Sequence, residues 1–296
     1  MPSTSSVMSS SGAALVPSRR LALCFLVKRD VLFLDAWAAW LSADARALVF
    51  VHASDGAPAP EGRAALNGFP REFVPTLPTA WGEFSLIKAA QSLFERACHS
   101  GAELCVLLSS DAVPVVPFEE LYAELVGGGP LRSWIADAAP NVNHAEREAL
   151  ALHQRAAAPS WRAEWSEKWQ WRVSSQWVVL TREAVAALSS HWHAFEAVFG
   201  GTVCPDEHAY VVFFKCIDYD DFVKASPVAV DWDGETSPCP LGEVHPPLGN
   251  SPRVYHSQEE LIAAADQARA AHSSGGPRAF FIRKVCHHVH PPASFW

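Results

Sequence analysis

The sequence predicts an α/β fold in which a mixed, mostly parallel central sheet is flanked by helices. Three observations support this fold class: continuous apolar runs of strand length, amphipathic segments between them, and turn-forming residues at the junctions. The first run, LALCFLV at 21–27, is apolar throughout, which is typical of a strand buried on both faces. Strand and helix patterns then alternate to about residue 126, as in parallel sheets that are covered on both sides.

The first half of the chain contains the clearest elements. The expected strands are LALCFLV (21–27), ALVFVHA (47–53), REFVPT (71–76) and AELCVLLSS (102–110). The expected helices are VLFLDAWAAWL (31–41), WGEFSLIKAAQSLFERACHSG (81–101) and PFEELYAELVGGG (117–129). Gly101 is a C-cap signal for the second helix, because glycine readily adopts the left-handed conformation that ends a helix.

The second half has a mixed pattern. Residues 130–168 lose the alternation and are expected to form a partly helical surface insertion. The expected strands are SSQWVVLT (174–181), PVAVDWD (227–233) and RAFFIRK (278–284). The expected helices are REAVAALSSHWHAF (182–195), PDEHAYVVFFKCI (205–217), and 261–272 behind a capping box of Ser257 and Glu260. No linker separates independent domains, so we expect a disordered tail at 1–19 and one domain at 20–296.

Composition and charge exclude several classes. The net charge is −9 and no Lys/Arg run is longer than the two arginines of SRR, which argues against nucleic acid as a partner. The sequence has seven cysteines and no CxxC motif. Because seven is an odd number, the cysteines cannot all form disulfides, and we expect a reducing compartment. The early apolar run at 21–27 is far shorter than the roughly 20 residues that span a bilayer. We expect a cytoplasmic or otherwise soluble protein without a signal peptide or membrane span.

Polar residues just past the predicted strand ends are the first site candidates, since ligands of open α/β sheets bind outside the carboxyl ends of the strands. These candidates are His52, Asp55, Ser109 to Asp111, Arg283 and Lys284. An Arg–Lys pair at such a position could hold a diphosphate, although solvated cations at a strand end are the simpler alternative. The sequence contains neither GxGxxG nor GxxxxGK[ST], so Rossmann dinucleotide and P-loop sites are not supported.

The sequence gives weak grounds for a metal ion. LLSSDAVP (107–114) carries a single acid where a D-x-D would hold a divalent cation, and DWD (231–233) lies late in the chain. CHHVH (286–290) offers zinc ligands, but neighbouring side chains of an extended segment cannot all converge on one ion. We expect no metal and no other cofactor. Arg283 and Lys284 would then neutralise the charge of a leaving diphosphate.

Glu207 is the candidate general base. In VCPDEHAY (203–210), Pro205 suits a first helical turn and Glu207 lies about three residues into the predicted helix. A helix N-terminus favours an ionised carboxylate, which is the form that a base needs at neutral pH. Acids in a first turn are also common helix stabilisers, so this stretch by itself leaves both interpretations open.

Three segments in order, WRVSSQWVVLTRE (171–183), CPDEHAY (204–210) and FFIRKV (280–285), resemble the core-2/I-branching enzyme family, glycosyltransferase family 14. FVHASDG (50–56) and two segments at 81–97 and 104–122 are similar to the plant branch of that family. The resemblance covers roughly residues 20–290. The family contains β-1,6-N-acetylglucosaminyltransferases and peptide xylosyltransferases.

The resemblance implies a GT-A-type fold, with a nucleotide-binding half at 20–126 and an acceptor and catalytic half at 168–290. It implies an inverting, metal-independent transfer of a sugar, GlcNAc or xylose, from a UDP-sugar to a glycan or glycoprotein hydroxyl, forming a β-linkage. The donor sugar itself cannot be chosen from the residues. The alternative is a catalytically inactive protein of the same fold that binds glycans or nucleotide sugars.

The resemblance also implies roles for single residues. Glu207 matches the catalytic base, with Asp206 beside it on the acceptor side. The expected donor-binding residues are Val27, His52, Asp55, Asp111, Arg283 and Lys284. The expected acceptor-binding residues are Ser175, Trp177, Asp206 and Trp232. The sequence departs from the plant pattern in two places: Ser174 stands where that pattern has glycine, and Asp111 is one position away from its acid.

Overall fold

The computed structural model describes residues 19–57, 69–127, 129–138, 168, 172–202, 204–231, 253–273 and 278–295. Residues 1–18 of the predicted tail and most of the predicted insertion at 130–168 lie outside these residues. Within the described chain, no helix combines the length and apolar character needed to cross a bilayer.

The main sheet is mixed, as the sequence predicts, with the strand order β3-β2-β1-β4-β7-β6-β8. Its parallel part contains β1 (Leu21–Val27), β2 (Ala47–Ala53), β3 (Glu72–Phe73) and β4 (Leu104–Ser109). Its other part contains β6 (Ser133–Trp134), β7 (Val179–Thr181) and β8 (Phe222–Val223), where β7 runs antiparallel to β4 and β6, and β6 is parallel to β8. The α/β class and the mostly parallel sheet are therefore confirmed.

A second sheet of three strands has the order β5-β10-β9. It contains β5 (Val113–Pro114), β9 (Val228–Val230) and β10 (Phe281–Arg283). β10 pairs antiparallel with β5 and parallel with β9. Because β5 begins four residues after β4 ends, this pairing brings the end of β10 to the carboxyl edge of the main sheet.

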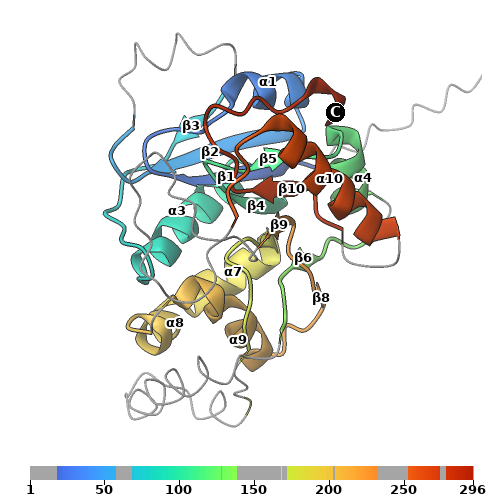
Figure 1. Ribbon diagram of the computed structural model, residues 1–296. Coiled ribbons are helices and arrows are strands. Elements are labelled where there is room, and N and C mark those ends of the chain that lie inside the picture. The colour runs from blue at the N-terminus through green and yellow to red at the C-terminus, as the bar shows by residue number, and fades with distance from the viewer. Residues whose placement is uncertain are drawn as a thin grey trace, which may run out of the picture.

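Helices cover both faces of the parallel strands, which explains why β1 is apolar throughout (Figure 1). The helices are α1 (Leu34–Leu41), α3 (Ser85–His99), α4 (Phe118–Val126), α7 (Arg182–Ser190), α8 (Trp192–Phe199), α9 (Ala209–Cys216) and α10 (Gln258–Ser273). Short 3₁₀ turns are η1 (Pro205–Glu207) and η2 (Ala293–Phe295). On one face, Trp37 of α1 packs edge-on against Phe25 of β1 at 5.0 Å between ring centroids. α3 packs on the other face of β1 and β2.

Two predicted helices are interrupted. The pattern at 182–195 predicts one helix, but α7 ends at Ser190 and α8 begins at Trp192, because His191 leaves helical geometry and its ring nitrogen binds the carbonyl of Ala187 at 2.9 Å. The helix predicted at 205–217 splits at His208 into η1 and α9. The helix-ending role of Gly101 is confirmed by its positive φ of 95°.

α10 begins with the predicted capping box. The N–H of Glu260 donates to the Ser257 hydroxyl at 3.2 Å, and the Glu260 carboxylate accepts the N–H groups of His256 and Ser257 at 2.7 and 3.3 Å. These bonds satisfy backbone donors that the first turn of a helix leaves unpaired.

Replacing Ser257 by alanine should lower the free energy of unfolding by about 1 kcal/mol, because the first turn of α10 loses a hydrogen-bond acceptor. Urea denaturation of the two proteins measures this difference. Ser273→Ala is the control, since the Ser273 hydroxyl at the other end of α10 donates to the Arg269 carbonyl of its own helix at 3.1 Å. Equal losses for both variants would contradict the capping role.

Candidate active site

The site lies at the carboxyl edge of three adjacent parallel strands. Leu26 of β1 is in register with His52 of β2 on one side and with Ser109 of β4 on the other. Two strand spacings therefore separate His52 from Ser109, which is about 10 Å. Residues that follow these strands face a common edge, as expected for a ligand site of an open α/β sheet.

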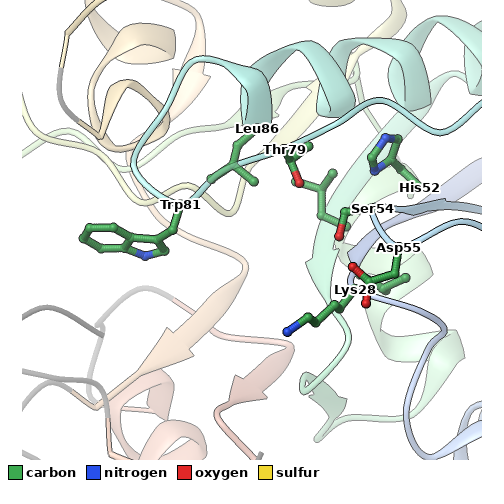
Figure 2. Close-up of a pocket in the computed structure, with 9 residues that line it drawn as sticks. Lys28, His52, Ser54, Asp55, Thr79, Trp81 and Leu86 are labelled. Carbon is green, nitrogen blue, oxygen red and sulfur yellow. The ribbon is translucent and has the colours of Figure 1, made fainter. Parts of the chain in front are cut away.

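A cavity of about 320 Å³ opens at the ends of β1 and β2 (Figure 2). Its lining includes three residues that the sequence analysis assigned to donor binding, Val27, His52 and Asp55. The remaining lining residues are Leu26, Lys28, Ser54, Thr79, Trp81 and Leu86. Figure 2 shows Lys28 extending toward the side of the cavity on which Trp81 lies.

Sequence reasoning missed Trp81, which has 53% of its surface exposed and is the exposed large hydrophobic side chain of the described residues. The predicted helix at 81–101 begins with Trp81, but α3 begins at Ser85, so Trp81 lies ahead of the helix, and periodicity gave no reason to assign it to the site. An exposed aromatic ring at a cavity mouth can stack on a flat ligand group.

His52 forms the inner wall of the cavity. Its side chain is buried, and its Nε2 accepts the N–H of Leu77 at 2.9 Å. Burial lowers the pKa of His52, so the ring is neutral at physiological pH. At the rim, Asp55 pairs with Arg29 at 3.5 Å.

Arg283 is the centre of the second part of the site. Its Nε lies 3.4 Å from Oδ1 of Asp111, and its guanidinium carbon lies 4.7 Å from the centre of the Trp177 ring. Asp111 also accepts a hydrogen bond from the Ser109 hydroxyl. Burial favours a higher pKa for Asp111, but the charges of Arg283 and Lys284 and the Ser109 bond outweigh burial and leave the pKa lowered. Asp111 is therefore an ionised carboxylate, and in this form it pairs with Arg283.

Glu207 and Asp206 lie on η1, which two backbone bonds hold in place. The carbonyl of Glu207 accepts the N–H of Ser174 at 2.7 Å, and the N–H of Cys204 donates to the carbonyl of Gly82 at 2.9 Å. Gly82 follows Trp81 and has a positive φ of 72°, a conformation that favours glycine. η1 is thus tied to the cavity rim on one side and to the segment before β7 on the other.

The helix-terminus part of the Glu207 prediction is wrong. Glu207 ends a three-residue 3₁₀ turn rather than lying inside the first turn of α9. Burial raises the pKa of Glu207, and the Arg283 charge opposes that rise only in part. Burial and the Glu207 charge raise the pKa of Asp206 to about 7, again against Arg283. Arg283 is therefore close enough to act on both carboxyl groups.

Two buried polar atoms of this cluster have no hydrogen-bond partner within the described part of the chain, Oδ1 of Asp206 and Nε of Arg283. Buried polar atoms are nearly always hydrogen-bonded. Nε of Arg283 is already in the ion pair with Asp111 at 3.4 Å, so Oδ1 of Asp206 is the atom with which a substrate group can pair.

The structure places the predicted acceptor-binding residues in different surroundings. Trp177 was predicted to bind the acceptor, but it is only 4% exposed and lies under Arg283, so its ring does not offer an open face to a sugar. The Ser175 hydroxyl accepts the N–H of Trp177 at 3.2 Å, which stabilises the local turn. Trp232 lies outside the described residues.

The model of the family described as Branch: Core-2/I-Branching enzyme matches residues 21–251, which contain both the cavity and η1. The chain belongs to the core-2/I-branching enzyme family. The family match does not separate its branches, so the likeness to the plant branch stays a prediction. No curated protein sequence matches the chain.

Two solved structures show a distant likeness to this member of the family. One is a mycobacterial protein, with 15% identity and a TM-score of 0.31 over 56% of this chain and 54% of that one, so the chain spans about half its length. The other is glucosyl-3-phosphoglycerate synthase from Mycobacterium tuberculosis, whose structure contains Mn²⁺ and UDP. It has 12% identity and a TM-score of 0.35 over 88% of this chain and 81% of that one. Likenesses this low carry no argument about the site.

Replacing Asp206 by asparagine should stabilise the protein at alkaline pH. A folded-state pKa of about 7, against 3.8, means that the native state binds more protons than the unfolded state between these values. Stability therefore falls as pH rises through that window, by up to about 4 kcal/mol for Asp206. The variant should gain up to that amount at pH 8 and little at pH 4, measured by urea denaturation at both pH values.

Asp137→Asn is the matched control for sign. Burial favours a higher pKa for Asp137, but Arg172 and Lys215 outweigh burial and leave the pKa lowered. The wild type therefore gains stability from Asp137 as pH rises, and Asp137→Asn should become less stable than the wild type over the same range. A gain for Asp206→Asn that is the same at both pH values would contradict the raised pKa.

Proposed function

We propose that this protein is an inverting, metal-independent glycosyltransferase of the GT-A type. It transfers a sugar, GlcNAc or xylose, from a UDP-sugar to a hydroxyl of a glycan or glycoprotein and forms a β-linkage. The observation that carries the proposal is the position of Arg283, which acts on Glu207 and Asp206 from the carboxyl edge where the cavity opens.

The donor occupies the cavity and the groups beside it. The uracil ring lies near Val27 and the wall formed by His52, where the exposed ring of Trp81 can stack on it. The diphosphate then extends along the sheet edge toward Arg283 and Lys284. The span of about two strand spacings between His52 and Ser109 suits the distance from a nucleobase to its diphosphate.

Arg283 stabilises the departing UDP. Negative charge develops on the diphosphate as the glycosidic bond breaks, and a fixed cation at that point lowers the energy of the transition state. Asp111 and Trp177 hold the guanidinium in place before the donor binds, so little reorganisation is needed. Arg283 and Lys284 supply the two positive charges that a metal ion supplies in other nucleotide-sugar sites.

Glu207 removes the proton from the acceptor hydroxyl. The oxygen attacks the anomeric carbon from the face opposite UDP, the bond to the UDP oxygen breaks, and the configuration inverts. A base is most effective when its pKa is near the working pH, and the raised pKa of Glu207 moves it in that direction. The unpaired Oδ1 of Asp206 can accept a hydrogen bond from another acceptor hydroxyl.

Replacing Glu207 by glutamine should lower kcat by about 10²- to 10⁴-fold, because the acceptor loses its general base. Binding of the UDP-sugar should change little. UDP release is measured with UDP-GlcNAc, UDP-xylose and UDP-glucuronic acid and a panel of glycan acceptors, with EDTA present. Glu259→Gln, an exposed change on α10, is the matched control.

A different result would contradict each part of the proposal. Rates near wild type for Glu207→Gln would show that the base is wrong. Loss of wild-type turnover in EDTA, with the protein still folded, would overturn metal independence. Donor binding without any turnover would favour the alternative of an inactive binding protein.

A further inference from the structure

The second half of the chain contains a cluster of nitrogen and sulfur side chains away from Glu207. One ligand atom from each of His256, Cys286 and His288 lies within 4.8 Å of the other two. We propose that these three residues bind a zinc ion. The proposal does not depend on the glycosyltransferase activity.

The ligand set is the one that zinc prefers. Thiolate and neutral imidazole bind zinc and other borderline or soft ions, whereas calcium and magnesium take oxygen ligands. At the usual zinc bond lengths, tetrahedral geometry separates a sulfur ligand from a nitrogen ligand by about 3.6 Å. Cys286 Sγ lies 3.1 Å from Nδ1 of His288, so small side-chain movements are sufficient to admit the ion.

Hydrogen bonding prepares His288 as a ligand. Its Nε2 lies 3.1 Å from the carbonyl oxygen of His256, an acceptor, so this nitrogen carries the proton. The other nitrogen, Nδ1, then has a free lone pair and is the one that faces Cys286. Zinc-binding histidines commonly donate their second N–H to a carbonyl or carboxylate in this manner.

The backbone brings the three ligands together from two distant segments. The N–H of Tyr255 donates to the carbonyl of Lys284 at 2.9 Å, and the N–H of Cys286 donates to the carbonyl of Tyr255 at 3.0 Å. His256, next in the chain, is fixed by its N–H bond to Glu260 of the α10 capping box. Backbone pairing therefore brings the two segments together, and their arrangement does not depend on a bound ion.

The ion would join the start of α10 to the segment that follows β10. This segment leaves the strand that carries Arg283, so zinc would anchor the chain just beyond the two cations of the proposed donor site. Three protein ligands leave a fourth position for water, and no step of the proposed transfer passes through the ion.

The test is the metal content of the full-length protein, purified without a histidine tag after growth with zinc and analysed by mass spectrometry of the metals. One equivalent of zinc is expected in the wild type and in His290→Asn, an exposed histidine of the same segment. His256→Asn, Cys286→Ser and His288→Asn should each lose most of it. His288 is exposed, so its variant should remain folded, which circular dichroism checks.

Cobalt substitution identifies the sulfur ligand. Cobalt-loaded wild type and His290→Asn should show a thiolate-to-cobalt charge-transfer band in the near ultraviolet, and Cys286→Ser should not. A wild type without zinc and without this band would overturn the proposal, as would full zinc content in the folded His288→Asn variant. Neither readout uses turnover, so both are independent of the outcome for Glu207.

Discussion

The contacts of Arg283 are the constraint on which the rest of the site depends. This side chain is largely buried, and a buried guanidinium is stable only when it is paired. Asp111 after β4 pairs with it, and Trp177 before β7 packs against it. Its charge also stabilises the ionised forms of Asp206 and Glu207, which burial destabilises. The short second sheet explains how this is possible, because β5 directs β10 across the end of β4.

Several parts of this arrangement could be predicted from local sequence. β1 and β2 have the bounds that their apolar runs indicate, since a strand buried on both faces must be apolar throughout. The rule that ligands bind at the carboxyl ends of strands selected His52, Asp55, Asp111 and Arg283, and the structure brings them to one edge of the sheet. Their roles in binding and catalysis stay predictions until they are measured.

Other parts depend on contacts that no local pattern reveals. β5 has two residues, and its pairing with β10 joins positions far apart in the chain, so periodicity did not predict the second sheet. Burial of Glu207 is likewise a tertiary effect, and it raises the pKa, whereas the expected helix terminus would lower it. The proposed zinc ligands also depend on a contact between distant segments. CHHVH was visible as a motif, but His256 joins it only through the pairing of residue 255 with residue 285.

The most direct test of the central claim compares UDP and uridine binding to wild type and to Arg283→Met by isothermal titration calorimetry. The account predicts that the variant binds UDP about 10- to 100-fold more weakly, since it loses a charged hydrogen bond to the diphosphate. Uridine, which lacks the diphosphate, should bind both proteins equally through the cavity near His52. Equal UDP affinity for both proteins, or an equal loss for UDP and uridine, would contradict the role given to Arg283.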